Sequence, residues 1–66
     1  MWTKERIRDL RERYGETQAE FAKRLGLTSH AVGFYEQGRG RPPGPVVKLL
    51  DILERDCAAA AQSTKK

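Results

Sequence analysis

The chain has 66 residues and a formal net charge of +4, because 13 lysine and arginine residues face 9 aspartate and glutamate residues. A chain of this length forms one domain that hides only about 60% of its unfolded surface, so there is little room for both a core and a deep catalytic pocket. A basic surface on so small a body is typical either of a protein with a polyanionic partner or of a surface that serves solubility alone.

The use of cysteine and of apolar residues narrows the class of protein further. One cysteine, Cys57, excludes a disulfide within the chain and a cysteine-based zinc site. No apolar run approaches the ~20 residues needed to span a bilayer. The segment from residue 2 to residue 13 is rich in charged residues, whereas a signal peptide has an apolar region there. We therefore expect a cytoplasmic protein with no metal, no cofactor and no membrane partner.

The first predicted helix runs from about Lys4 to Tyr14, with Thr3 as its N-cap. Trp2 and Ile7 occupy the two positions of a hydrophobic staple around that cap. Apolar side chains recur at helical spacing and form the stripe that faces the core: Ile7, Leu10 and Tyr14. Gly15 is expected to end the helix in the left-handed conformation.

The second predicted helix opens with TQAE, in which Thr17 and Glu20 are spaced as a capping box, and it ends at Gly26. Its inward side chains are Phe21, Ala22 and Leu25. Only GLT, residues 26 to 28, separates it from the next helix. So short a turn forces two helices to cross steeply, which is the geometry of a helix-turn-helix.

The third predicted helix covers TSHAVGFYEQG, residues 28 to 38, with Thr28 as its cap and Gly38 as its stop. Leu27 and Val32 form a second staple, and Val32 and Tyr35 face the core. The remaining side chains are expected to face outward: Ser29, His30, Gly33 and Phe34. In a helix-turn-helix this face enters a DNA major groove about 12 Å wide, where base edges are read.

Each of these outward residues also has an ordinary structural interpretation. Ser29 and His30 lie in the first turn and carry donors and acceptors for bases, but an exposed histidine is common on any surface. Gly33 costs ~1 kcal/mol relative to alanine within a helix, and it either permits a close approach to DNA or accommodates packing. Phe34 either contacts a thymine methyl group or belongs to the core, for which Tyr35 is the better candidate.

The segment RGRPPGP, residues 39 to 45, cannot be helical, and Pro45 suits the first position of a fourth helix. The predicted apolar face of that helix consists of Val46, Leu49, Leu50 and Leu53, continued by Cys57 as a small buried side chain. Val47 and Ile52 lie beside this face, either as peripheral core or as the start of an interface. We expect one domain over residues 1–57 and an alanine-rich tail over 58–66, helical at first and disordered by Ser63.

The segment TQAEFAKRLGLTSHAVGFYEQGRGRP closely resembles the helix-turn-helix of the phage Cro and repressor (XRE-type) family. The similarity extends from about Ile7 to Leu53. It includes the T-Q-A-E-x-A opening, the glycine after the second helix, the capping threonine, and YEQG followed by basic residues. The fold expected from this resemblance is all-α, a compact bundle of four to five helices.

The resemblance implies that the third helix binds double-stranded DNA, usually as a homodimer on a palindromic operator. It implies that bases are read by Gln18, Ser29, His30, Gly33 and Phe34. It implies phosphate contacts by Thr17, Gln18, Thr28, Gln37, Arg39 and Arg41. It also implies a structural ion pair between Arg11 and Glu36 that holds the third helix against the first.

The sequence departs from the family pattern at two places. Glu16 replaces the usual apolar residue before Thr17, so the second helix lacks its staple and carries a negative charge that faces the phosphates. Only the alanine-rich tail is left to form a fifth helix. The loop at residues 39 to 45 and the helix after it look more like antitoxin-type members than like the phage repressors.

Three functions are compared on this basis. The first is a nucleoid-associated transcriptional regulator, in particular a repressor. The second is an antitoxin-type protein that binds a toxin and regulates its own operon, since the fold alone does not decide the function. The third, a membrane-surface peptide, fits poorly because the basic residues do not line one amphipathic face. We predict that the protein is not an enzyme, because its one histidine and one cysteine form no set of base, orienting group and nucleophile.

Overall fold

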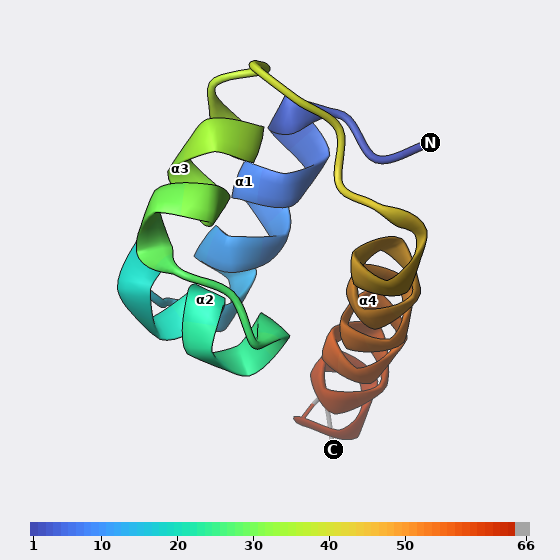
Figure 1. The fold of residues 1–66 in the computed structure, drawn as a ribbon. Helices are drawn as coiled ribbons and strands as arrows, with labels where there is room; N and C mark the ends of the chain where they lie inside the picture. The colour runs from blue at the N-terminus through green and yellow to red at the C-terminus, as the bar shows by residue number, and fades with distance from the viewer. Residues whose placement is uncertain (65–66) are drawn as a thin grey trace.

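The computed structural model describes the backbone of residues 1–64 and the side chains of residues 1–59. Four helices follow one another in this part of the chain: α1 (Lys4–Tyr14), α2 (Gln18–Leu25), α3 (Ser29–Glu36) and α4 (Gly44–Thr64) (Figure 1). No strand occurs among residues 1–64. The predicted all-α fold is confirmed, with four helices in the described residues.

The helices begin where the capping residues of the sequence place them. Thr3 accepts a hydrogen bond from the backbone N–H of Arg6 at 3.2 Å, and Thr28 accepts one from Ala31 at 3.1 Å. At α2 both halves of the capping box form, with the Thr17 hydroxyl 3.2 Å from the Glu20 nitrogen and the Glu20 carboxylate 2.9 Å from the Thr17 nitrogen. Local sequence therefore determines the start of each of the first three helices.

The turn between α2 and α3 depends on Gly26. This residue has a φ of 74°, in the left-handed region that side chains with a Cβ disfavour. Its N–H donates back to the end of α2, and Leu27 then packs against the core while Thr28 caps α3. The chain thus turns from one helix into the next within three residues.

The core lies where α1, α2 and α4 meet, with one side of α3 closing it. It consists of Trp2, Ile7, Leu10, Phe21, Ala22, Leu25, Val32, Val46 and Leu50. Tyr35 packs against this core, whereas 40% of Phe34 is exposed. The choice of Tyr35 as the core aromatic residue is therefore confirmed.

Helix α4 differs from its predicted form in which side chains it buries. Leu49 was expected in the core-facing stripe but is 38% exposed. The residues that face α1 and α2 are Val46, Leu50, Leu53 and Cys57, a stripe at i, i+4, i+7 and i+11. The rotation of α4 that buries this stripe also half-buries Val47, and it turns Leu49 and Ile52 toward solvent.

The ends of α4 also differ slightly from expectation. Gly44, and not Pro45, is its first residue, and the carbonyl of Pro43 accepts the hydrogen bond of Val47 at 3.0 Å. The helix continues through the alanine-rich segment to Thr64, and the disorder expected from Ser63 stays a prediction. Residues 65–66 lie outside the described residues.

Polar contacts fasten α4 to the start of the chain. The Trp2 indole N–H donates to Asp51 at 2.7 Å, and Arg6 forms an ion pair with Glu54 at 3.0 Å. The Tyr14 hydroxyl donates to the carbonyl of Leu53 at 2.8 Å. These contacts span the length of α1, so α4 is held along one side of α1, and α3 stays on the side that α4 does not cover (Figure 1).

Candidate nucleic-acid interface

The outer side of α3 carries an open hollow of about 280 Å³. We call it the α3 hollow, and its lining consists of Gln18, Ser29, His30, Gly33, Phe34, Gln37 and Arg39. All five residues that the sequence assigns to base reading are in this set, and so are three of the six assigned to phosphate contact, because Gln18 carries both assignments. Residues from α2, α3 and the following loop therefore meet at one surface.

Three of the expected phosphate ligands lie outside the α3 hollow. The hydroxyls of Thr17 and Thr28 accept the capping hydrogen bonds at the starts of α2 and α3, so each keeps its proton free to donate. Arg41 lines a different concavity, which it shares with Trp2 and Pro42. Arg39 lines both surfaces and connects them.

Gly33 lines the α3 hollow, but it is buried and not exposed as the sequence suggested. The Gln18 side chain lies over it, because a Cβ built on Gly33 would stand 3.3 Å from Gln18 Oε1. A side chain at this position would push the end of the glutamine aside by a few tenths of an ångström. The packing interpretation of Gly33 therefore accounts for its place in the helix, while base reading by Gly33 stays a prediction.

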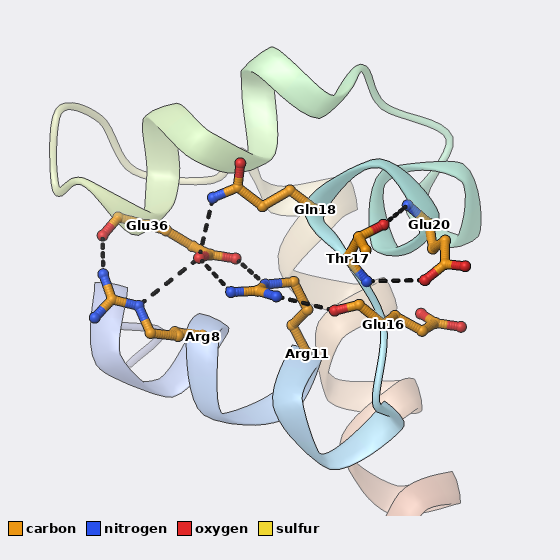
Figure 2. A network of polar contacts seen from close by, with 7 residues as sticks. All are labelled: Arg8, Arg11, Glu16, Thr17, Gln18, Glu20 and Glu36. Atoms are coloured by element: carbon orange, nitrogen blue, oxygen red, sulfur yellow. Dashed lines mark hydrogen bonds and ion pairs between the residues drawn. The ribbon is translucent and has the colours of Figure 1, made fainter.

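Beneath the α3 hollow lies a buried carboxylate, Glu36, which is 2% exposed. The ion pair expected with Arg11 is present: Arg11 Nε lies 2.7 Å from Glu36 Oε2 and Nη2 lies 3.2 Å from Oε1 (Figure 2). The hydrogen bond to Glu36, with the attraction of its charge, raises the pKa of Arg11 despite the opposing effect of burial. Gln18 Nε2 also donates to Oε1, at 3.3 Å.

The sequence reasoning missed Arg8. Its guanidinium donates to the backbone carbonyl of Glu36 at 3.3 Å and lies 3.8 Å from the Glu36 carboxylate (Figure 2). The signal was present in the sequence, because Arg8 precedes Arg11 by three residues and shares its face of α1. Two arginines of α1 and a glutamine of α2 thus hold the last turn of α3.

Glu16 does not carry an uncompensated negative charge. Arg24 pairs with it through two of its three guanidinium nitrogens, Nε and Nη2, with Nε 3.1 Å from Glu16 Oε1. This hydrogen bond, with the charge of Arg24, lowers the pKa of the Glu16 carboxyl against a smaller opposing effect of burial. The Arg24 guanidinium also lies 4.4 Å from the centre of the Tyr14 ring. The residue that stands where the family has an apolar staple residue is therefore part of an ion pair.

Phe34 is held although it is partly exposed. Its ring meets Tyr35 edge to face, with 6.2 Å between the ring centres. Gly40 also lies close to this ring, since a Cβ built on it would overlap the ring atoms. The N–H of Arg39 donates to the carbonyl of Phe34 at 3.2 Å. The loop after α3 thus folds back on Phe34 and carries Arg39 to the edge of the α3 hollow.

Comparison with known proteins identifies the family. The family model described as a helix-turn-helix domain matches residues 5–62. The chain belongs to this helix-turn-helix family. The resemblance to helix-turn-helix proteins of the XRE type is thereby confirmed.

Two curated relatives carry matching names. A protein of Pyrococcus furiosus, named as an HTH-type transcriptional regulatory protein, is 47% identical over 62 residues, which cover 76% of this chain and 20% of the relative. An Archaeoglobus fulgidus protein, named as an uncharacterized HTH-type transcriptional regulator, is 43% identical over 37 residues, which cover 56% of this chain and 53% of the relative. The chain thus spans about a fifth and about half of these relatives. No solved structure matches the chain.

Two further findings concern the described residues alone. None of the helices there is both long and apolar enough to cross a membrane. Within the same residues, no group of three histidine, cysteine, aspartate or glutamate side chains is arranged to hold a metal ion.

Proposed function

We propose that this protein is a sequence-specific, double-stranded DNA-binding transcriptional regulator, and that it acts as a repressor. The observation that carries the proposal is the α3 hollow, where residues from three segments of the chain meet on one surface. These residue types suit DNA, because they combine base-reading groups with a cation at the rim. The names of the two relatives agree with this function.

We assign base reading to side chains that line the α3 hollow. Ser29 and His30 stand in the first turn of α3, and their side chains donate to and accept from base edges. Phe34 offers a ring edge to a thymine methyl group, and the loop packed behind it keeps the ring in place. Gln18 reaches the same surface from α2, across Gly33.

Phosphate contacts surround this surface. The free N–H groups at the start of α2 favour an anion, and Thr17 and Gln18 stand beside them. Thr28 occupies the corresponding place before α3. On the opposite side of the α3 hollow, phosphate contacts are made by the residues that follow α3: Gln37, Arg39 and Arg41. These contacts fix the register of the protein on the duplex and carry no sequence information themselves.

Repression then follows from occupancy, because a bound protein blocks polymerase. One module of this size reads few bases, so we propose that two copies bind a palindromic operator. Their half-sites would lie about 34 Å apart, or a multiple of that distance, on one face of the duplex. The surface that Leu49 and Ile52 expose on α4 offers one place for the copies to meet. The protein would act in the cytoplasm, bound to the nucleoid.

Selection of bound oligonucleotides from a random pool tests this proposal. The expected result is a two-fold symmetric consensus, with an affinity for random duplex DNA that falls steeply as salt rises. A protein that binds no duplex DNA even at low salt would contradict it. A protein-binding module that holds a toxin would then remain as the second candidate, without regulation of its own operon, and with the exposed Leu49 and Ile52 side chains as the contact for the toxin.

A further inference from the structure

Gly40 lies close to the ring of Phe34, and the contact leaves no room for a side chain. A Cβ built on Gly40 would stand 2.4 Å from Cε2 of the ring, 3.2 Å from Cδ2 and 3.3 Å from Cζ. Non-bonded carbon atoms rest about 3.5–4.0 Å apart, so a residue with a Cβ would have to push the ring by about 1 Å. The place of the ring therefore depends on the absence of a side chain at residue 40.

The conformation of the backbone does not account for this glycine. Among the residues that the structure describes, the glycines with a positive φ are Gly15, Gly26 and Gly38, and Gly40 is not one of them. A left-handed turn, which favours glycine, is thus not the reason for glycine at residue 40. The contact with Phe34 is a reason, because it excludes even the smallest side chain.

The loop after α3 brings Gly40 to the ring through two hydrogen bonds. The N–H of Gly38 donates to the carbonyl of Tyr35 at 3.1 Å, and the N–H of Arg39 donates to the carbonyl of Phe34 at 3.2 Å. Tyr35 packs against the core and meets the Phe34 ring edge to face. The ring thus contacts both a core aromatic residue and the loop, although 40% of Phe34 is exposed.

Gly40 itself does not line the α3 hollow. It lines the other concavity, together with Trp2 and Arg41, whereas Phe34 lines the α3 hollow. The contact with Phe34 therefore connects Gly40 to the surface that is proposed to read bases. The position of the ring matters there, because a gap of about 0.5–1 Å already removes a quarter to a half of an apolar contact.

We propose that Gly40 is a positioning residue for base reading, whose bare backbone places the Phe34 ring against the C5 methyl group of one thymine. The proposal rests on the proposed DNA-binding function and deepens it, because it names the group on the base and the residue that sets the reader. In the major groove this methyl group distinguishes thymine from the other bases. Gly40 stands between Arg39 and Arg41, so the loop that is proposed to bind phosphates also sets a base contact.

Replacement of thymine by uracil in the selected operator tests the contact, because it removes only the C5 methyl group. We would prepare one duplex for each thymine position. At one position, uracil should weaken wild-type binding about fourfold, which is the effect of one buried methyl group. Phe34→Ala should bind both duplexes equally. In Gly40→Ala the effect should fall to about twofold or less, because the new Cβ displaces the ring.

A double variant separates the ring from the phosphate contacts of the loop. The three atoms nearest to the new Cβ all belong to the ring, and Phe34→Ala removes them. Gly40→Ala should therefore weaken operator binding in the wild-type background and have no effect in the Phe34→Ala background. Gly44→Ala is the control, because no atom lies within 4 Å of its new Cβ, and it should keep the fourfold effect of the methyl group.

Three results would overturn the proposal while the DNA-binding function stands. A Gly40→Ala variant that keeps the full effect of the methyl group would show that the ring does not need this glycine. An equal loss from Gly40→Ala in both backgrounds, with a flatter salt dependence, would assign the effect to phosphate contacts of Arg39 and Arg41. A wild-type protein that binds thymine and uracil duplexes equally at every position would exclude the contact itself. Failure to select an operator at all would instead contradict the proposed function.

Nuclear magnetic resonance of the wild-type chain tests the geometry without a variant. The α protons of Gly40 should show nuclear Overhauser effects to the ring protons of Phe34, both in the free protein and in the operator complex. Their absence in the complex would overturn the proposal even if Gly40→Ala does not fold. Binding by the variants is compared at a temperature at which circular dichroism shows a folded chain.

Discussion

Arg11 Nε and Glu36 Oε2 lie 2.7 Å apart and join the middle of α1 to the end of α3. The carboxylate is almost completely buried, and the guanidinium is largely covered. Because both groups have lost most of their water, each depends on the other for its hydrogen bonds. The position of α3 relative to α1 thus depends partly on this pair, together with the contacts of Arg8 and Gln18 to Glu36.

Removal of the Glu36 carboxylate should destabilise the fold. We expect Glu36→Ala to lower the free energy of unfolding by about 3 kcal/mol, because it leaves the Arg11 charge buried without a partner. Urea denaturation followed by circular dichroism measures this loss. Asp9→Ala is the control, since it breaks the exposed pair between Asp9 and Arg13 on α1 and should change little. A Glu36→Ala melting temperature equal to that of the wild type would refute the structural role of this pair.

Arg39 is expected to contribute affinity without selectivity. Arg39→Ala should weaken binding to the operator and to random duplex DNA by similar factors, and it should reduce the slope of log K against log salt by about 0.9 for each lost phosphate contact. Arg41→Ala should behave in the same way. Arg13→Ala removes an equal charge from the exposed Asp9 pair and serves as the control. A loss confined to one base pair would instead make either arginine a base reader.

Phe34 and His30 are expected to contribute selectivity. Phe34→Ala should weaken the preference for a thymine by about 1–3 kcal/mol, because the base methyl group loses its apolar contact, while affinity for random DNA changes little. His30→Ala should alter the preference at a different base pair. Repeated oligonucleotide selection measures both. Ile52→Ala removes an exposed apolar side chain from α4, outside the α3 hollow, and should leave the consensus unchanged. If both α3 variants select the wild-type operator, these residues are not readers.

Gly33→Ala separates stability from recognition. Alanine favours the helix over glycine by ~1 kcal/mol, so the variant should be no less stable than the wild type. Its new Cβ would stand 3.3 Å from Gln18 Oε1 and displace the end of that flexible side chain. We therefore expect weaker discrimination at the base pair that Gln18 contacts, measured by competition between operator variants. Gly44→Ala, with open space around the new Cβ, should show no such loss.

Acid should destabilise the protein partly through Glu16. Since Arg24 lowers the pKa of this carboxyl below its ordinary value of about 4.5 in the folded state, the pair contributes its full stability above that value. The contribution is lost as the pH falls through the folded pKa. Thermal unfolding between about pH 7 and pH 2 should show a smaller decline for Glu16→Gln than for the wild type. Parallel curves would mean that the pair adds no pH-dependent stability.

Much of the fold was predictable because its signals are local. The capping box of Thr17 and Glu20 and the stop at Gly26 act within a few residues of each other along the chain, so their spacing is visible in the sequence. The residues that line the α3 hollow could be predicted from the resemblance to a helix-turn-helix, because in that motif α2 and α3 cross in a known way. The burial of Gly33 did not follow, because it depends on which α2 side chain lies across it.

The sequence by itself determined where the first three helices begin and that the chain is all-helical. It also determined which side chains of α3 share the α3 hollow. Only the tertiary structure decided that α4 turns Leu49 to solvent, that Arg8 joins the Glu36 pair, and that Gln18 of α2 donates to Glu36. The physical reason is distance along the chain. Caps and stops are satisfied within a single turn of helix, whereas the orientation of a buried polar group depends on partners that packing brings from other helices.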